Sequence, residues 1–306
     1  MLSCVLCKSD QSRLLFRGKD TYMNVDDKYY DLYQCLKCKL TTLDPLPNES
    51  ELSKYYPSNY KIFIENKIDK KNNKNYLSKI KNYMITLFKL NHLENNLDVF
   101  KNKDINYLDY GCGNGKNIFK LRLRYKNWNF FGYDKYNSKN LNNHDDKITF
   151  INDFNKFEKI ENNFFDIINL SSVIEHVHNP LELISQLNKK LNQNGLIIIK
   201  TPNFSSLSRK IFGKNWHNLD IPRHLHIFSD KNLEKLLFKN NLKKKEIIYS
   251  RNSGVEIKSI YNLLKIKRSN STHNNYVRLL NPLTFLLSLF KQSSTITIIA
   301  NKDEKI

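Results

Sequence analysis

A glycine-rich turn follows the first apolar run in the central part of the chain. It contains Asp109, Gly111, Gly113 and Gly115 in the segment DYGCGNG, and a helical pattern begins directly after it. Because glycine has no Cβ, alternate glycines let the backbone pass against a ligand at the carboxyl edge of a sheet. The spacing G-x-G-x-G differs from the dinucleotide fingerprint G-x-G-x-x-G, and no G-x-x-x-x-G-K-[ST] segment occurs. The turn therefore predicts a site for another kind of cofactor.

Acidic side chains also stand at the ends of the next two apolar runs. Asp134 follows FFGY, and Asn152 and Asp153 follow KITFI. The carboxyl ends of parallel strands meet at one edge of a doubly wound sheet, which is where such sheets bind ligands. With Asp109, the pattern places three acids at three consecutive strand ends, and it predicts one cofactor site that the three strands share.

Histidines and one arginine gather in two later segments, NLSSVIEHV and WHNLDIPRHLHIFS. Histidine titrates close to neutral pH, so His176 and His224 are candidates to take a proton from an acceptor hydroxyl. Arg223 is a candidate to pair with a carboxylate or phosphate of the acceptor. We therefore predict that these three residues are catalytic. For His217 and His226, packing or helix capping explains the sequence as well as function does.

Four of the five cysteines form two C-x-x-C pairs, Cys4 with Cys7 and Cys35 with Cys38. In a reducing compartment such pairs indicate metal binding rather than disulfides, and both pairs together can close one tetrahedral zinc site. A segment of this size buries too little surface to fold well alone, so a bound metal would supply stability. We predict a structural zinc site within a module that spans residues 1–60.

Strand and helix patterns alternate over residues 105–306. Apolar runs of strand length (INYLDY, FFGYD, KITFIND, FFDIINLSS, GLIIIKT) alternate with helical patterns, of which Pro180 to Leu191 is the clearest. Further strands are expected around Lys245 to Tyr249 and at Thr295 to Ala300. This alternation predicts a doubly wound α/β sheet of seven strands with an antiparallel last strand. Residues 61–104 are interpreted as a linker and a lead-in helix.

The net charge of +20 would attract polyanions, including RNA and anionic membrane surfaces. However, the lysines are spread along the chain together with asparagines, which indicates a compositionally biased, solvated surface. Cysteines and charges occupy the start of the sequence, where a signal peptide would be apolar. The longest apolar stretch, Leu279 to Phe290, is shorter than the roughly 18 to 20 residues that span a bilayer. We expect a cytoplasmic protein without stable membrane insertion.

The glycine-rich turn resembles motif I of class I S-adenosylmethionine-dependent methyltransferases, D/E-x-G-x-G-x-G. The W-x-x-L-D-x-P-R-H-L-x-x-F-S block is similar to one in a bacterial branch of that family associated with surface-polysaccharide and other secondary biosynthesis. The start of the chain, with Tyr33-Gln-Cys35 and LDPLP from Leu43 to Pro47, resembles the zinc segment of some sugar methyltransferases. The resemblance implies a Rossmann-like methyltransferase sheet over residues 105–306 and a small zinc-ribbon-like N-terminal module.

The same resemblance implies a role for each residue of the cofactor site. Asp109 corresponds to the acid that faces the aminopropyl portion and the sulfonium, and Asp134 to the acid that binds the two ribose hydroxyls. Asn152 and Asp153 correspond to the position that meets the adenine amino group. Cys112 is interpreted as a small apolar filler rather than a nucleophile. The full set implied to bind the cofactor is Asp109, Gly111, Cys112, Gly113, Gly115, Asp134, Asn152, Asp153 and Leu170.

The implied activity is methyl transfer from S-adenosylmethionine to a small molecule, such as a sugar or a precursor of a surface polysaccharide or secondary metabolite, carried on a nucleotide or lipid. The N-P-P-Y and D-P-P-Y motifs of exocyclic-amine methylation are absent, which disfavours acceptors of that kind. Two alternatives remain: an RNA methyltransferase that uses the zinc module and basic surface, and a non-catalytic zinc-bearing interaction protein on a methyltransferase scaffold. The acceptor atom, the oligomeric state and the pathway stay open.

Overall fold

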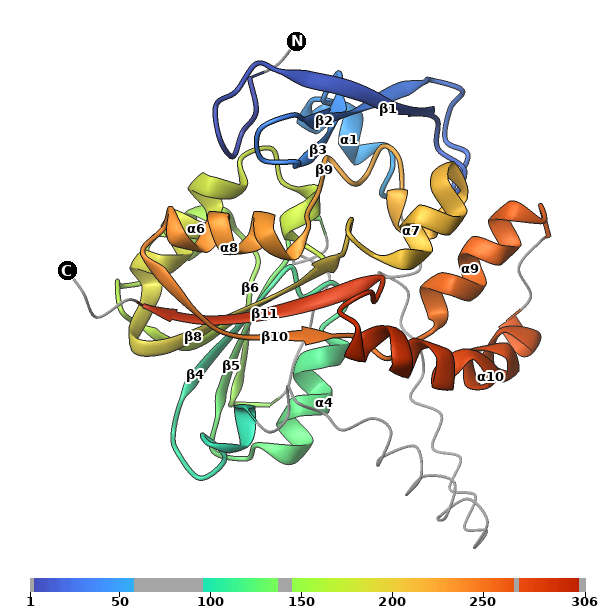
Figure 1. Ribbon diagram of the computed structural model, residues 1–306. Coiled ribbons are helices and arrows are strands. Elements are labelled where there is room, and N and C mark those ends of the chain that lie inside the picture. The colour runs from blue at the N-terminus through green and yellow to red at the C-terminus, as the bar shows by residue number, and fades with distance from the viewer. Residues whose placement is uncertain (1–2, 58–95, 137–144, 267–269, 303–306) are drawn as a thin grey trace, which may run out of the picture.

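Two β-sheets organise the chain (Figure 1). The computed structural model describes residues 3–57, 96–136, 145–266 and 270–302. The larger sheet has the strand order β10-β11-β8-β7-β4-β5-β6. Its strands are β4 (Asn106–Tyr110), β5 (Asn129–Tyr133), β6 (Ile148–Ile151), β7 (Phe165–Ser171), β8 (Leu191–Pro202), β10 (Leu242–Tyr249) and β11 (Thr295–Lys302).

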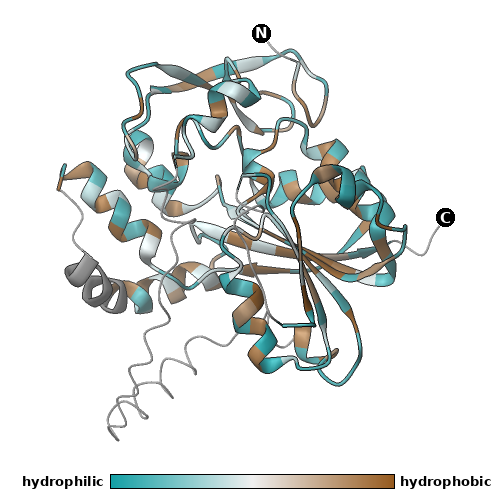
Figure 2. Cartoon of the chain, turned by 180° about the vertical axis from the view of Figure 1, so that it is seen from behind, coloured by the Kyte–Doolittle hydropathy of each residue, from teal (hydrophilic) through white to brown (hydrophobic). Residues whose placement is uncertain are grey.

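The pairing of these strands confirms the predicted doubly wound sheet. Strands β6, β5, β4, β7 and β8 are parallel neighbours, and β11 runs antiparallel between β8 and β10. The apolar runs lack alternation because helices cover both faces of a parallel sheet. Ile197, Ile198 and Ile199 of β8 are all buried, although their side chains point alternately to opposite faces. Figure 2 shows apolar residues concentrated along the strands of this sheet.

Helices on the two faces form at sequence signals that are easy to recognise. On one face, α6 (Pro180–Lys190) begins with a proline after the cap Asn179, and α8 (Asp230–Phe238) begins with a capping box at Ser229. On the other face, α4 (Lys116–Arg124) follows the glycine-rich turn (Figure 1). The short α5 (Phe154–Glu158) connects β6 to the loop before β7. These helices hold the loops at the carboxyl edge of the sheet in place.

The N-terminal segment forms a smaller antiparallel sheet of β1 (Ser12–Gly18), β2 (Tyr30–Cys35) and β3 (Thr41–Asp44). Its fourth strand, β9 (His226–Ile227), comes from the C-terminal half of the chain and pairs with β3. Helix α1 (Glu49–Ser53) follows with a capping box at Asn48. The predicted module of residues 1–60 therefore shares its sheet with residues far along the chain.

The remaining elements lie beside the N-terminal sheet and along one side of the larger sheet (Figure 1). They are η2 (Ile174–His176), α7 (Leu207–Phe212), η3 (Gly213–Asn215), η4 (His217–Leu219), α9 (Gly254–Leu263) and α10 (Asn270–Leu289). One apolar cluster joins Leu32 and Leu43 of the N-terminal sheet to Trp216 and Leu225 in the C-terminal half of the chain. Among the described residues, no helix is both long and apolar enough to cross a membrane. Most of the predicted linker and lead-in helix, residues 58–95, lies outside the described residues.

Candidate active site

The glycine-rich turn has the backbone geometry that only glycine adopts without strain. Gly111, Gly113 and Gly115 have φ values of +80°, +56° and +73°. A Cβ built on Gly111 would lie 2.3 Å from Cγ2 of Val173, so the turn also packs directly against the segment after β7. The turn therefore lies at the carboxyl edge of the sheet and contacts the segment that carries His176.

Asp134 fixes this turn from the end of β5. Its Oδ2 accepts a hydrogen bond from the backbone N–H of Gly113 at 2.9 Å, and its Oδ1 accepts one from the N–H of Tyr136 at 2.9 Å. The side chain is only 8% exposed. A carboxylate oxygen can accept more than one hydrogen bond, so an acid at this position can hold the turn and also bind a ligand. This arrangement suits an acid that binds a pair of hydroxyls.

Asp109 is buried at the end of β4 and is held by two amides. Its Oδ1 accepts from Asn169 at 2.7 Å and its Oδ2 from Asn117 at 3.3 Å. Burial raises the pKa of Asp109 to about 6, and the two amide hydrogen bonds oppose that shift. No cation neutralises the carboxylate among these partners, which suits a cationic ligand. Sequence reasoning missed Asn117, which lies in the first turn of α4, and gave Asn169 no role of its own.

The other predicted cofactor residues have mixed surroundings. Asn152 and Asp153 follow β6 with exposed side chains, and Asp153 caps α5 by accepting from the N–H of Asn155 at 2.9 Å. Leu170 is fully buried in the core of β7, so its side chain is not available to a cofactor and only its backbone could take part in the predicted site. Cys112 is buried and burial raises the pKa of its thiol, as expected of a packed, neutral filler.

The structure brings the two predicted catalytic histidines together. Nδ1 of His176 lies 2.9 Å from the carbonyl oxygen of Arg223, and Nδ1 of His224 lies 2.8 Å from the carbonyl oxygen of Asn218. A carbonyl oxygen only accepts, so each Nδ1 carries a proton, and in a neutral ring Nε2 then carries the lone pair. The ring centroids are 4.7 Å apart. Burial lowers the pKa of His176 to about 3, so this ring is neutral at physiological pH.

Glu175 adds a carboxylate to this pair. Its Oε2 accepts a hydrogen bond from the hydroxyl of Thr201 at 2.9 Å, and its Oε1 is buried without a hydrogen-bond partner among the described residues. One ligand atom each of Glu175, His176 and His224 lies within 4.8 Å of the others. Sequence reasoning did not assign Glu175 to the site, although it directly precedes His176.

Arg223 does not face an acceptor, and its predicted role is wrong in this arrangement. The guanidinium is fully buried and forms ion pairs of 2.8 Å with both Asp20 and Asp220. It also lies over the ring of Tyr22. All its charge is therefore compensated inside the protein, and Arg223 connects the loop that bears His224 to the N-terminal segment.

The other two histidines of the second block behave differently from each other. His226 is fully buried in β9, where its ring contacts the Thr42 hydroxyl and the carbonyl oxygen of His178, both at 3.2 Å. His226 thus fits the packing interpretation. His217 is half-buried and lines a cavity of about 240 Å³ between the N-terminal sheet and the segment after β8.

This cavity combines cationic and aromatic side chains. Its lining includes Arg17, Lys19, Tyr22, Tyr29, Lys214, Trp216, His217 and Asp220. The indole Nε1 of Trp216 is buried without a hydrogen-bond partner among the described residues. Asp220 lies between the cavity and the histidine pair, because its carboxylate is 3.9 Å from Nε2 of His224. The cavity therefore adjoins the group of Glu175, His176 and His224.

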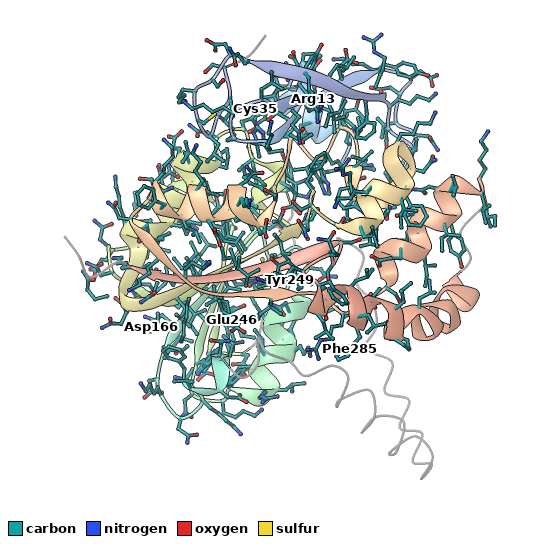
Figure 3. The ribbon with its side chains drawn as sticks, in the orientation of Figure 1. Arg13, Cys35, Asp166, Glu246, Tyr249 and Phe285 are labelled. Atoms are coloured by element: carbon teal, nitrogen blue, oxygen red, sulfur yellow. The ribbon has the colours of Figure 1, made fainter. Side chains whose placement is uncertain are left out.

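The four N-terminal cysteines converge as predicted. Sγ of Cys4 lies 3.5 Å from Sγ of Cys38, and Sγ of Cys7 lies 3.5 Å from Sγ of Cys35. A tetrahedral zinc with bonds of about 2.3 Å places its sulfur ligands about 3.8 Å apart, so the set fits this metal with small adjustments. Figure 3 shows Cys35 in the N-terminal sheet, away from the strands of the larger sheet.

Comparisons with known proteins agree with this architecture. A family model described as a methyltransferase domain matches residues 76–247, more than half of the chain. A SAM-dependent methyltransferase from Archaeoglobus fulgidus is 20% identical over 74% of this chain and 100% of its own, with a TM-score of 0.45. One from Mesorhizobium loti is 12% identical over 65% and 91%, with a TM-score of 0.43.

A further solved structure is phosphoethanolamine N-methyltransferase 2 of Haemonchus contortus in complex with S-adenosyl-L-methionine. It is 16% identical over 69% of this chain and 53% of its own, with a TM-score of 0.45. The comparison with curated proteins finds no match. The family model covers the glycine-rich turn, the acids at the strand ends and the Glu175-His176 segment. The chain belongs to the methyltransferase-domain family and is a class I S-adenosylmethionine-dependent methyltransferase.

Proposed function

We propose that the enzyme methylates a small molecule that carries an anionic group, such as a sugar linked to a nucleotide or a lipid phosphate. The observation that carries this proposal is the cavity lined by Asp220, which gathers aromatic rings and the cations Arg17, Lys19 and Lys214. Arg17 and Lys19 also pair with Asp31 and Asp27, so Lys214 is the cation on which the proposal mainly rests. Cations suit a phosphate, and aromatic faces suit a sugar ring or a nucleobase. The buried Nε1 of Trp216 offers a further hydrogen bond to such a ligand.

The cofactor side of the reaction is supplied by the strand ends. In this proposal Asp134 accepts hydrogen bonds from the ribose hydroxyls, Asp109 compensates the cationic aminopropyl portion, and Asp153 meets the adenine. The glycine-rich turn lets the backbone approach without a Cβ in the way. When bound, S-adenosylmethionine supplies an electrophilic methyl group on a sulfonium. Positioning then provides most of the rate, because the displacement needs little further chemistry from the protein.

The acceptor side is supplied by the histidine pair. Each Nδ1 donates to a backbone carbonyl, so Nε2 of each neutral ring carries the lone pair, and Nε2 of His224 lies 3.9 Å from Asp220, which lines the cavity. An acceptor anchored through its phosphate in the cavity would thus present a hydroxyl to these lone pairs. Arg223 and Asp220 support this arrangement by position, because their ion pair holds the loop that bears His224.

We also propose that zinc occupies the four-cysteine site. Lys8 and Lys39 follow the second cysteine of each pair with positive φ values of 60° and 63°, and their N–H groups donate to the carbonyl oxygens of Cys4 and Cys35. The same turn is therefore built twice around one point, which supports a shared metal. The carbonyl oxygen of Cys38 accepts from Asn232 of α8 at 2.6 Å, so the site would also stabilise the attachment to the catalytic half.

Incubation with S-adenosylmethionine and a panel of nucleotide-linked sugars, lipid-linked sugars and RNA would test the proposed acceptor. We expect formation of S-adenosylhomocysteine with a methylated phosphate-bearing small molecule. Lys214→Gln should raise KM for that acceptor about tenfold with a smaller effect on kcat. Lys210→Gln is the matched control, because Lys210 is exposed on α7 and does not line the cavity. Methylation of RNA alone would contradict the proposal.

Metal analysis of the purified chain would test the zinc site. We expect about one zinc per chain, loss of zinc in Cys35→Ser, and retention in Cys112→Ser, whose thiol lies in the cofactor turn. Cys35→Ser should also lower the free energy of unfolding. A chain that folds and binds S-adenosylmethionine with no zinc bound would show that the cysteines serve another purpose.

A further inference from the structure

Glu175, His176 and His224 each place one ligand-capable atom at the same point. Both Nδ1 atoms donate to backbone carbonyls, so the neutral forms of the two rings carry their lone pairs on Nε2. Oε1 of Glu175 has no hydrogen-bond partner among the described residues, although its Oε2 accepts from Thr201. All three are acceptors, and a lone acceptor cannot satisfy another acceptor.

A buried carboxylate oxygen without a partner is costly, and it calls for a proton or a cation. Glu175 is fully buried, so bulk water does not reach it. The neutral forms of the two histidine rings supply no proton to it, because their single protons are donated from Nδ1 to backbone carbonyls. A cation at this point would satisfy the three atoms at once.

The spacing of the three atoms agrees with coordination to one cation. In each of the three residues, one ligand-capable atom (a carboxylate oxygen of Glu175 or a ring nitrogen of each histidine) lies within 4.8 Å of those of the other two. Nitrogen and oxygen ligands bind divalent transition metals at about 2.0 to 2.2 Å, so two ligands of one metal are at most about 4.4 Å apart. Movements of a few tenths of an ångström in the side chains would close the set. Each histidine is already oriented by a backbone acceptor on its other nitrogen, as metal-binding histidines commonly are.

We propose that Glu175 Oε1, His176 Nε2 and His224 Nε2 bind one divalent transition-metal cation next to the cofactor turn. Two histidines and one carboxylate leave coordination positions open for a substrate oxygen. Val173, two residues before Glu175, packs against Gly111 of the turn, so the cation would lie close to the cofactor. The site is separate in residues and in ligand chemistry from the four-cysteine site.

The cation deepens the proposed function and rests on it for its role in the reaction. It would bind the acceptor hydroxyl and lower the pKa of that hydroxyl, so that the proton passes to a water molecule that enters with the acceptor. The deprotonated acceptor oxygen forms a bond to the methyl carbon of S-adenosylmethionine. The bond between that carbon and sulfur breaks, and its electron pair goes to sulfur. His176 and His224 would then act as metal ligands rather than as bases.

Cobalt(II) titration of the zinc-loaded full chain, followed by visible absorption and calorimetry, tests this site without any assay of activity. We expect one additional Co²⁺ per chain, with visible d–d bands and without intense thiolate charge-transfer absorption, because the ligands are nitrogen and oxygen. Glu175→Gln and His224→Gln should each weaken Co²⁺ binding at least about tenfold. His217→Gln is the matched control, because His217 lies in the same block and outside the three-ligand group.

The proposal would be overturned if the zinc-loaded chain binds no Co²⁺ beyond a signal with thiolate charge transfer. It would equally be overturned if both Glu175→Gln and His224→Gln bind Co²⁺ like the unchanged chain. Circular dichroism and calorimetric binding of S-adenosylmethionine accompany each titration. A chain that binds S-adenosylmethionine and no Co²⁺ refutes the metal site alone, whereas a chain that binds Co²⁺ and no S-adenosylmethionine refutes the proposed function.

Discussion

The hydroxyl of Tyr56 lies 2.9 Å from Nδ1 of His176, which joins the N-terminal segment to the turn after β7. The ring of Tyr56 also stacks on Tyr136, with centroids 4.7 Å apart and an interplanar angle of 15°. The N–H of Tyr136 in turn donates to Asp134. One residue of the N-terminal segment therefore contacts both the histidine pair and the loop behind the cofactor acid.

Tyr56→Phe removes the hydroxyl and keeps the ring that stacks on Tyr136. The hydrogen bond to His176 should stabilise its orientation by about 1 kcal/mol, so kcat should fall about fivefold. The affinity for S-adenosylmethionine should stay unchanged. Steady-state kinetics and calorimetry would measure both quantities. Tyr249→Phe is the control, because its hydroxyl bonds Asp230 away from the site. A loss of cofactor affinity with unchanged kcat would contradict the assigned role.

Asp20→Asn should be strongly destabilising. Asp20 is buried, pairs with Arg223, and accepts from the N–H groups of Tyr22, Met23 and Val25. Breaking one partner of a buried ion pair costs about 3 to 5 kcal/mol. Asp31→Asn is the matched control, because its partner Arg17 is exposed and such pairs contribute about 1 kcal/mol or less. Urea unfolding would compare the two variants, and equal losses would refute the argument.

The same ion pair predicts how stability changes in acid. Burial acts to raise the pKa of Asp20, but the hydrogen bonds and charge of Arg223 outweigh burial and hold it below the ordinary value. The contribution of Asp20 is therefore complete above a pH of about 4, and it is lost as pH falls through its lowered pKa. Asp20→Asn should lose less of its remaining stability between pH 4 and 2 than the unchanged chain does. Equal losses of the free energy of unfolding in the two chains would contradict the lowered pKa of Asp20.

The pKa of Asp109 predicts a pH dependence of cofactor binding. Burial raises it to about 6, so the carboxylate becomes protonated as pH falls through this value. The attraction to a cationic ligand is then lost, and the affinity for S-adenosylmethionine should decrease by about tenfold per pH unit well below 6. Calorimetric titrations from pH 8 to 5 would show the decrease. Asp109→Asn should bind weakly with little pH dependence in this range. An unchanged affinity across this range would exclude the role of Asp109.

The strands of the larger sheet could be predicted because their signal is local. Runs such as GLIIIK are apolar at successive positions, and burial on both faces of a parallel sheet requires this pattern. Strand periodicity also contained the information that Leu170 faces the core, since Asn169 on the opposite face bonds Asp109. The resemblance that assigned Leu170 to the cofactor did not take this alternation into account.

Other features of the structure differ from the sequence-based predictions because they depend on contacts between residues far apart in the sequence. Arg223 suggested an anion-binding role because its two counter-ions could not be recognised, and Asp20 stands 203 residues away. The strand β9 has only two residues, and it exists because β3 offers Thr41 and Thr42 as pairing partners. No local periodicity marks a strand of that length. Glu175 was missed because its unpaired oxygen becomes visible only when Thr201 and the two histidines are placed around it.

Calorimetric titration of S-adenosylmethionine into the zinc-loaded full chain tests the central assignment most directly. The account predicts one cofactor bound per chain and an affinity at least about tenfold lower in Asp134→Asn, because the carboxylate fixes Gly113 and, in the proposed function, accepts from the ribose. Asp166→Asn is the matched control, since Asp166 accepts from Asn106 at the opposite edge of the sheet (Figure 3). A folded chain that binds no S-adenosylmethionine, or an Asp134→Asn variant that binds it like the Asp166→Asn control, would contradict the account.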